Sequence, residues 1–102
     1  MYPNCTFQTK KANLMFIDNP VGTGYSYVDD LSSLTTTNAQ IAADLVEVLK
    51  SVFTDQPDMQ VMPFYIFAES YGGKMTVDTA LALNTVSIFR VKNRVLKYVN
   101  IF

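Results

Sequence analysis

The sequence of 102 residues is long enough for one small domain at most. Its 49% hydrophobic and 17% charged residues are typical of a chain with a packed interior and exclude an intrinsically disordered protein. The formal net charge of -1 argues against a nucleic-acid partner, because such proteins carry a strongly basic surface. No stretch reaches the roughly 20 apolar residues of a membrane-spanning helix, so we expect no membrane partner.

Residues 1–11 are polar and irregular, and they show no apolar segment typical of a secretion signal. Cys5 is the single cysteine, so no disulfide can form within the chain. The tripeptide that begins at Asn4 fits the N-glycosylation sequon, which is a weak signal. The sequon would be used only if the chain entered the secretory pathway.

An almost continuous apolar run over 13–18 predicts a buried strand. A turn-rich loop over 19–27 follows it. The two glycines of this loop do not form a dinucleotide-binding fingerprint, because the third glycine of that pattern would fall on Tyr27. We expect neither a cofactor nor a metal ion. The loop residues that could line a pocket are Asn19, Pro20, Gly22 and Gly24.

A polar linker over 29–37 leads into a helix that we expect over 38–53. Thr37 and Gln40 form a capping-box pattern at its start. Apolar residues at helical spacing predict one buried stripe, made of Ile41, Leu45, Val48, Leu49 and Val52. Charged residues off the centre of this stripe should lie nearer to solvent, and they are Asp44, Glu47 and Lys50.

A second apolar run leads directly into a serine flanked by small residues. Its aromatic and β-branched residues predict a strand over 63–68 that is buried on both faces. The next residues, Ala68-Glu69-Ser70-Tyr71-Gly72, match the nucleophile elbow, small-x-Ser-x-Gly. In that motif a strand turns into a helix so tightly that only small side chains fit, and a helix over 72–83 is expected here. Alternatively, Ser70 simply caps that helix.

The order of strand, helix and strand implies a parallel pair with a right-handed crossover, and therefore an α/β fold. The loop over 19–27 and the serine turn would then both lie at the carboxyl ends of the strands. If the two strands are neighbours, the loop can wall a pocket over Ser70. The residues after 84 show one weak further strand pattern, over 95–101.

Two separated motifs resemble the serine carboxypeptidase family, peptidase family S10, and within it the retinoid-inducible enzymes. The first is Asp18-Asn19-Pro20-Val21-Gly22-Thr23-Gly24-Tyr25-Ser26-Tyr27, and the second is Phe64-Tyr65-Ile66-Phe67-Ala68-Glu69-Ser70-Tyr71-Gly72-Gly73-Lys74. The resemblance is strongest over 12–76. It implies that residues 1–102 are one partial α/β-hydrolase domain, with parallel strands, a crossover helix and the nucleophile elbow. It also implies a secreted or lysosomal enzyme that acts on the C-termini of peptides.

The resemblance assigns roles to the positions that match. Ser70 corresponds to the acyl-forming nucleophile, and the backbone N–H of Tyr71 to one oxyanion-hole donor. Glu69 corresponds to the acid that hydrogen-bonds the terminal carboxylate of the substrate. Only a protonated carboxyl can donate such a bond, so an acidic working pH is implied. Alternatively, Glu69 is a solvated charge near a helix start. The small residues of the elbow are Ala68, Gly72 and Gly73.

The resemblance also implies groups that this sequence lacks. The family's Gly-Gly-Pro loop would lie before residue 12, and its triad Asp and His would follow the serine, yet the sequence contains no histidine. A serine without a general base is a weak nucleophile, so we expect an inactive piece of a carboxypeptidase. Two alternatives remain. One is a non-catalytic relic or truncated isoform that at most binds a partner. The other is an esterase, which has no reason to place Glu69 against a substrate carboxylate.

Overall fold

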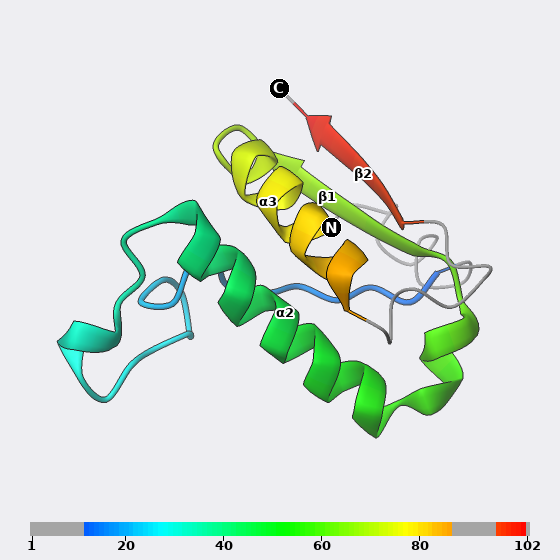
Figure 1. Cartoon of the computed structure of the whole chain (residues 1–102), viewed down its shortest axis with the longest axis horizontal. Helices are drawn as coiled ribbons and strands as arrows, with labels where there is room; N and C mark the ends of the chain where they lie inside the picture. The colour runs from blue at the N-terminus through cyan, green and yellow to red at the C-terminus, as the bar shows by residue number, and fades with distance from the viewer. Residues whose placement is uncertain (1–11, 87–95, 102) are drawn as a thin grey trace, which may run out of the picture.

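The computed structural model describes residues 12–86 and 96–101 of the chain (Figure 1). Its α-helices are α2 (Asn38–Asp55) and α3 (Gly72–Thr85), its strands are β1 (Phe64–Glu69) and β2 (Leu96–Ile101), and its short 3-10 helices are η1 (Leu31–Ser33) and η2 (Pro57–Val61). Helix α3 packs between α2 and the two-stranded sheet. No helix within the described residues is long and apolar enough to cross a membrane. The described part is therefore a small mixed α/β structure.

Helix α2 begins where the capping box predicted. The Gln40 N–H donates to Thr37 Oγ1 at 3.3 Å, and the Thr37 N–H donates to Gln40 Oε1 at 3.2 Å. Two N–H groups that would otherwise lack partners at the helix start are satisfied in this way. The helix runs to Asp55, two residues past its expected end, and stops before Pro57, whose ring cannot continue it.

The buried face of α2 differs from the predicted stripe. Val48 is 43% exposed, and Leu45 and Val52 are only half-buried, so the prediction is wrong for these three residues. Since successive residues of a helix are about 100° apart, the true stripe is turned by roughly one position. As a result of this rotation the buried stripe of α2 packs against α3, whereas the face of α2 that carries Val48 faces the loop over 19–27. The residues buried in α2 are Ile41, Ala42, Val46, Leu49 and Phe53.

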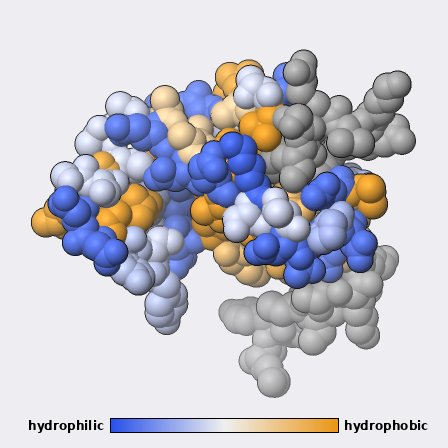
Figure 2. Space-filling model, turned by 60° about the horizontal axis from the view of Figure 1, so that its bottom comes forward, coloured by the Kyte–Doolittle hydropathy of each residue, from blue (hydrophilic) through white to orange (hydrophobic). Residues whose placement is uncertain are grey.

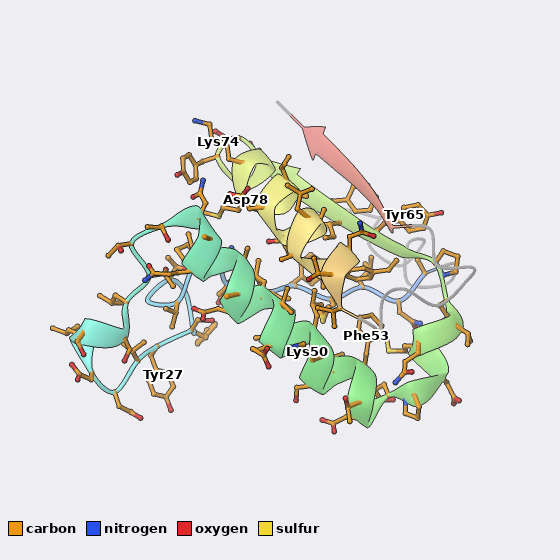
Figure 3. All side chains as sticks on the ribbon, viewed as in Figure 1. Tyr27, Lys50, Phe53, Tyr65, Lys74 and Asp78 are labelled. Carbon is orange, nitrogen blue, oxygen red and sulfur yellow. The ribbon has the colours of Figure 1, made fainter. Side chains whose placement is uncertain are left out.

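The packed core lies where α2, α3 and the start of β1 meet. Leu83 of α3 is completely buried, and it packs with Val46, Leu49 and Phe53 of α2. The rings of Phe53 and Phe64 meet edge to face with their centroids 5.5 Å apart. Figure 3 shows Phe53 at the end of α2 that is nearer to η2. This contact joins the last turn of α2 to the first residue of β1.

Strand β1 spans nearly the predicted range but is covered on one face only. Phe64, Ile66 and Ala68 are half-buried, whereas Tyr65 and Phe67 on the opposite face are 45% and 66% exposed. The prediction of a strand buried on both faces is therefore wrong. Among the described residues the helices cover the first face, and nothing covers the second to the same extent.

The parallel pair of the fold is formed by β1 and β2, with α3 between them in the sequence. The register runs from Phe64 opposite Leu96 to Glu69 opposite Ile101. The weakly indicated strand over 95–101 is thus confirmed. The predicted pairing of 13–18 with the elbow strand is wrong, because residues 12–18 form no strand in this structure.

The segment 12–18 nevertheless runs in the same direction as β1. At its beginning, Asn13 Nδ2 donates to Met62 Sδ, just before β1, at 3.7 Å. Just after its end, Asn19 Nδ2 donates to Met75 Sδ, in the first turn of α3, at 3.3 Å. Figure 1 shows this segment, in blue, running the same way as β1. The segment therefore delivers the loop over 19–27 to the end of the molecule where β1 turns into α3.

Candidate active site

Ser70 lies in the turn between β1 and α3, as predicted. Its backbone has φ +54°, in the left-handed region that a residue with a Cβ rarely adopts. The Gly73 N–H donates to the Ser70 carbonyl at 3.0 Å and closes the turn. Strained backbone of this kind persists only where the surrounding structure holds it, and it is concentrated at functional sites. Ser70 is exposed to solvent in the part of the chain that the structure describes.

The alternative that Ser70 caps α3 is wrong. The helix begins at Gly72, so the capping position is Tyr71, and no side-chain hydrogen bond caps this end. The hydroxyl of Ser70 is therefore not used to stabilise the helix start.

The small residues around Ser70 are in close contact, as the elbow motif requires. A Cβ placed on Gly72 would lie 3.2 Å from the Cβ of Ala68, which is tighter than ordinary van der Waals contact. The chain comes back on itself so sharply that residues on either side of Ser70 nearly touch. The turn has room for the methyl group of Ala68, but a second methyl group at position 72 would have to push the turn open.

Glu69 and Tyr71 stand on either side of Ser70. Glu69 is the last residue of β1 and is exposed. The Tyr71 ring is 54% exposed, and its hydroxyl donates to Asn38 Oδ1, the first residue of α2, at 3.0 Å. The Lys74 ammonium lies 5.5 Å from the centre of the same ring. Figure 3 shows Lys74 at the end of α3 that adjoins the turn.

The loop over 19–27 is braced from within by Asp18. The Tyr25 N–H donates to Asp18 Oδ2 at 2.8 Å, and the Ser26 hydroxyl donates to the Asp18 carbonyl, also at 2.8 Å. Gly24 has φ +55°, and a Cβ at this position would overlap the Asp18 carboxylate. Only glycine meets both demands, so the loop depends on Gly24 for its shape.

An open hollow of about 430 Å³ lies between this loop and α2. Ser70 is not part of its wall. Of the predicted pocket residues, Asn19 lines the hollow, whereas Pro20, Gly22 and Gly24 do not. Figure 3 shows Tyr27 on the loop side of α2, away from the labelled Lys74. The remaining lining residues are Ile17, Asp18, Val21, Tyr25, Ser26, Tyr27, Asp44, Glu47 and Val48.

Two structural features were missed by reasoning from sequence. Nothing in the sequence connects Asn38 with Tyr71, because these residues lie 33 positions apart. The brace made by Asp18 had a partial signal, since an Asp directly before a glycine-rich loop often accepts hydrogen bonds from the backbone that follows. The possible sequon at Asn4 and the cysteine beside it lie outside the described residues. Within the described ranges, no group of three or more His, Cys, Asp or Glu side chains could hold a metal ion.

Comparison with known proteins found a family match and several relatives. The serine carboxypeptidase family model matches residues 2–86. Retinoid-inducible serine carboxypeptidase of Homo sapiens is 44% identical over 81 residues, which are 79% of this chain and 18% of that protein. Serine carboxypeptidase-like 51 of Arabidopsis thaliana is 38% identical over 76 residues, or 72% of this chain and 16% of that protein.

A third relative is the venom serine carboxypeptidase of Apis mellifera, 37% identical over 76 residues, or 74% of this chain and 16% of that protein. The chain thus spans less than a fifth of the length of these relatives. No solved structure gave a significant match. The family match includes the loop over 19–27, the whole of α2 and the turn that holds Ser70 in its left-handed conformation. The chain belongs to the serine carboxypeptidase family.

Proposed function

We propose that this chain is part of an α/β-hydrolase domain and carries the nucleophile of a serine carboxypeptidase, Ser70. The observation that supports this role is the left-handed, exposed serine between β1 and α3, inside the stretch matched by the family model. A serine in this position can meet a substrate carbonyl from the open end of the strand. Acyl transfer to its hydroxyl releases the C-terminal residue of a peptide, and water then hydrolyses the acyl-enzyme.

The neighbours of Ser70 suit the remaining needs of this reaction. The Tyr71 N–H lies at the capping position of α3, where N–H groups have no partner within the helix, so it is well placed to stabilise a developing oxyanion. Glu69 is exposed beside the serine, where its protonated carboxyl can donate to the terminal carboxylate of the substrate. This pairing selects free C-termini and requires acidic conditions. A secreted or lysosomal parent protein fits such conditions.

The 102 residues do not supply a complete catalytic apparatus. They contain no histidine, and a serine hydroxyl needs a base to become an effective nucleophile. Even with the oxyanion hole intact, removing a triad member leaves only about 10³–10⁴-fold acceleration over water. We therefore infer that Ser70 acts only when the rest of a longer protein provides the base and the other walls of the cleft.

The first test measures the chain alone. Purified chain incubated with an N-blocked dipeptide between pH 4 and 8 is expected to release no C-terminal amino acid above background. The matched variants are Ser70→Ala and Ser51→Ala, the latter being an exposed position in α2. If the wild-type chain and Ser51→Ala turn over substrate and Ser70→Ala does not, the chain alone supplies a general base. The inference that it lacks one would then be wrong.

The second test uses the protein encoded by the full-length native transcript. Sequencing that transcript past residue 102 is expected to reveal an Asp and a His downstream of the serine. In that protein, Ser70→Ala should lower kcat by at least about 10³-fold, whereas Ser51→Ala should leave kcat unchanged. Full activity of the Ser70→Ala variant would exclude Ser70 as the nucleophile.

The competing proposals make different predictions in the second test. A transcript that ends near residue 102 favours a non-catalytic relic or truncated isoform. An esterase would hydrolyse simple esters without needing a free carboxylate, and its rate would not change in Glu69→Gln. In a carboxypeptidase, the preference for free C-termini should fall as the pH rises. This fall should be less steep in Glu69→Gln than in the wild type, because an amide donates a hydrogen bond at any pH. The family match favours the carboxypeptidase.

A further inference from the structure

The residue after Ser70 is held by a contact from a different part of the chain. The Tyr71 hydroxyl donates to Asn38 Oδ1 at 3.0 Å, which links the capping position of α3 to the first residue of α2. The other hydrogen bonds of residues 70–73 that the structure describes stay within the turn and the first turns of α3. The contact between Tyr71 and Asn38 is therefore the brace that reaches the turn from outside β1 and α3.

Asn38 is a firm point of attachment because the start of α2 is itself tightly held. Gln40 Oε1 accepts from the Thr37 N–H and, at 2.8 Å, from the Thr36 N–H. Thr37 Oγ1 accepts from the Gln40 N–H in return. These bonds fix the residues just before and just after Asn38, so its side-chain oxygen is presented from a rigid helix end.

The turn requires such a brace because Ser70 has a backbone conformation that is unfavourable for any residue with a Cβ. Rotation about the N–Cα bond of Ser70 would relieve the strain, and it would swing the following peptide and re-aim the Tyr71 N–H. The Tyr71 ring can follow such a rotation only if its hydroxyl leaves Asn38. The Lys74 ammonium over the same ring opposes that movement further, by a cation–π contact.

We propose that Asn38 is a positioning residue of the site. By holding the Tyr71 hydroxyl, it fixes the peptide between Ser70 and Tyr71, whose N–H is the oxyanion-hole donor. The identity of that donor rests on the function proposed above, whereas the positioning itself can be measured without activity. Helix α2 thereby acts on the reacting atoms through one hydrogen bond, although none of its residues touches them.

The experiment measures hydrogen exchange in the full 102-residue chain, by mass spectrometry at low concentration, with NMR for single amides. The Gly73 and Lys74 amides report on the turn, since they donate to the carbonyls of Ser70 and Tyr71. The Gln56 amide, which donates to the Val52 carbonyl, reports on the far end of α2. Asn38→Ala is expected to speed exchange at Gly73 and Lys74 by about 2- to 10-fold, the ratio that corresponds to one hydrogen bond. Gln56 should not change.

Three further variants separate positioning from general destabilisation. Asn38→Asp keeps an oxygen acceptor at the same place and should restore the exchange rates of the wild type. Tyr71→Phe removes the donor and should match Asn38→Ala, and the double variant should add nothing further. Asn84→Ala, the same substitution at an exposed position of α3, should have no effect on Gly73 or Lys74.

The proposal is overturned if Asn38→Ala leaves the Gly73 and Lys74 exchange rates unchanged, or if its effect and that of Tyr71→Phe add in the double variant. Activity of the full-length protein gives an independent readout, in which Asn38→Ala should lower kcat with little change in KM and Asn38→Asp should restore it. If Ser70→Ala loses activity and Asn38→Ala keeps full activity, the positioning role of Asn38 is contradicted. The proposal that Ser70 is the nucleophile would then still stand. Faster exchange in Asn38→Ala together with an active Ser70→Ala variant would refute the nucleophile instead.

Discussion

Ser70 shows how much of the proposed site depends on a few atoms. The left-handed φ of this serine and the 3.2 Å approach between Ala68 and a Cβ on Gly72 are two consequences of one tight turn. The sequence places Ala where the elbow motif more often has Gly, so this turn already holds one methyl group. The question for experiment is how much stability a second methyl group in this turn would cost.

Gly72→Ala should destabilise the chain by about 1–3 kcal/mol, because its methyl group would crowd that of Ala68. The double variant Ala68→Gly/Gly72→Ala moves the methyl group across the turn and should recover most of the loss. Urea unfolding followed by circular dichroism gives both values. If Gly72→Ala is as stable as the wild type, the turn is looser than this structure indicates.

Asp30 provides a pH-sensitive contact at the residue scale. The Ser32 N–H donates to Asp30 Oδ1 at 2.9 Å and caps η1. This backbone hydrogen bond, followed by one from the Ser32 side chain, lowers the pKa of Asp30 below its ordinary value of 3.8. Both bonds favour the charged carboxylate.

Because the folded pKa of Asp30 is lowered, its contribution to stability is complete above pH 3.8 and is lost as the pH falls through the lowered pKa. An NMR titration should therefore show the Ser32 amide resonance moving in that acidic range. Asp30→Asn keeps an oxygen acceptor that does not titrate, and should remove the movement while retaining the cap. A titration midpoint for Asp30 at or above 3.8 would contradict the assignment.

In helix α3, the position of a leucine along the helix determines how much its side chain contributes to stability. Leu83 is 0% exposed in the core, whereas Leu81, two residues earlier, is 64% exposed. Leu83→Ala should lower the free energy of unfolding by about 2–5 kcal/mol, and Leu81→Ala should change it by less than about 0.5 kcal/mol. Urea midpoints of the two variants test this directly. Equal losses would show that the α2–α3 contact is not formed.

At the scale of the molecule, the part that the structure describes exposes several large apolar side chains. Phe16 and Phe67 are 91% and 66% exposed, and the buried hydrophobic residues within the described ranges are few. Figure 2 shows hydrophobic patches at several places on one face of the molecule. A single uncovered sheet face is a common route to association between chains.

The isolated chain should therefore associate as its concentration rises, and β1 should contribute. Phe67→Thr removes an exposed ring from β1 but keeps a residue suited to a strand, so it should weaken association and lower the binding of a hydrophobic dye. Tyr25→Thr is the control, because Tyr25 is 96% exposed but lies in the loop. Sedimentation velocity at several concentrations measures the difference. Equal association of the two variants would mean that β1 does not mediate it.

The features determined by the sequence alone are those that depend on near neighbours along the chain. The capping box of Thr37 and Gln40 starts α2 because both partners lie within one turn. The elbow around Ser70 follows from small residues within five positions, and the family could be recognised from two short motifs for the same reason. Each of these can be read without knowing what packs against them.

Tertiary structure decided everything that depends on a distant partner. Val48 has the apolarity and the spacing of a core residue, yet α3 packs against the adjacent stripe and leaves it exposed. The run over 13–18 has the composition of a buried strand but forms none, and the parallel neighbour of β1 is β2 instead. The hydrogen bond from Tyr71 to Asn38 joins residues 33 positions apart. Burial, strand pairing and long-range contacts each depend on two surfaces that meet. A single stretch of sequence specifies only one of these two surfaces.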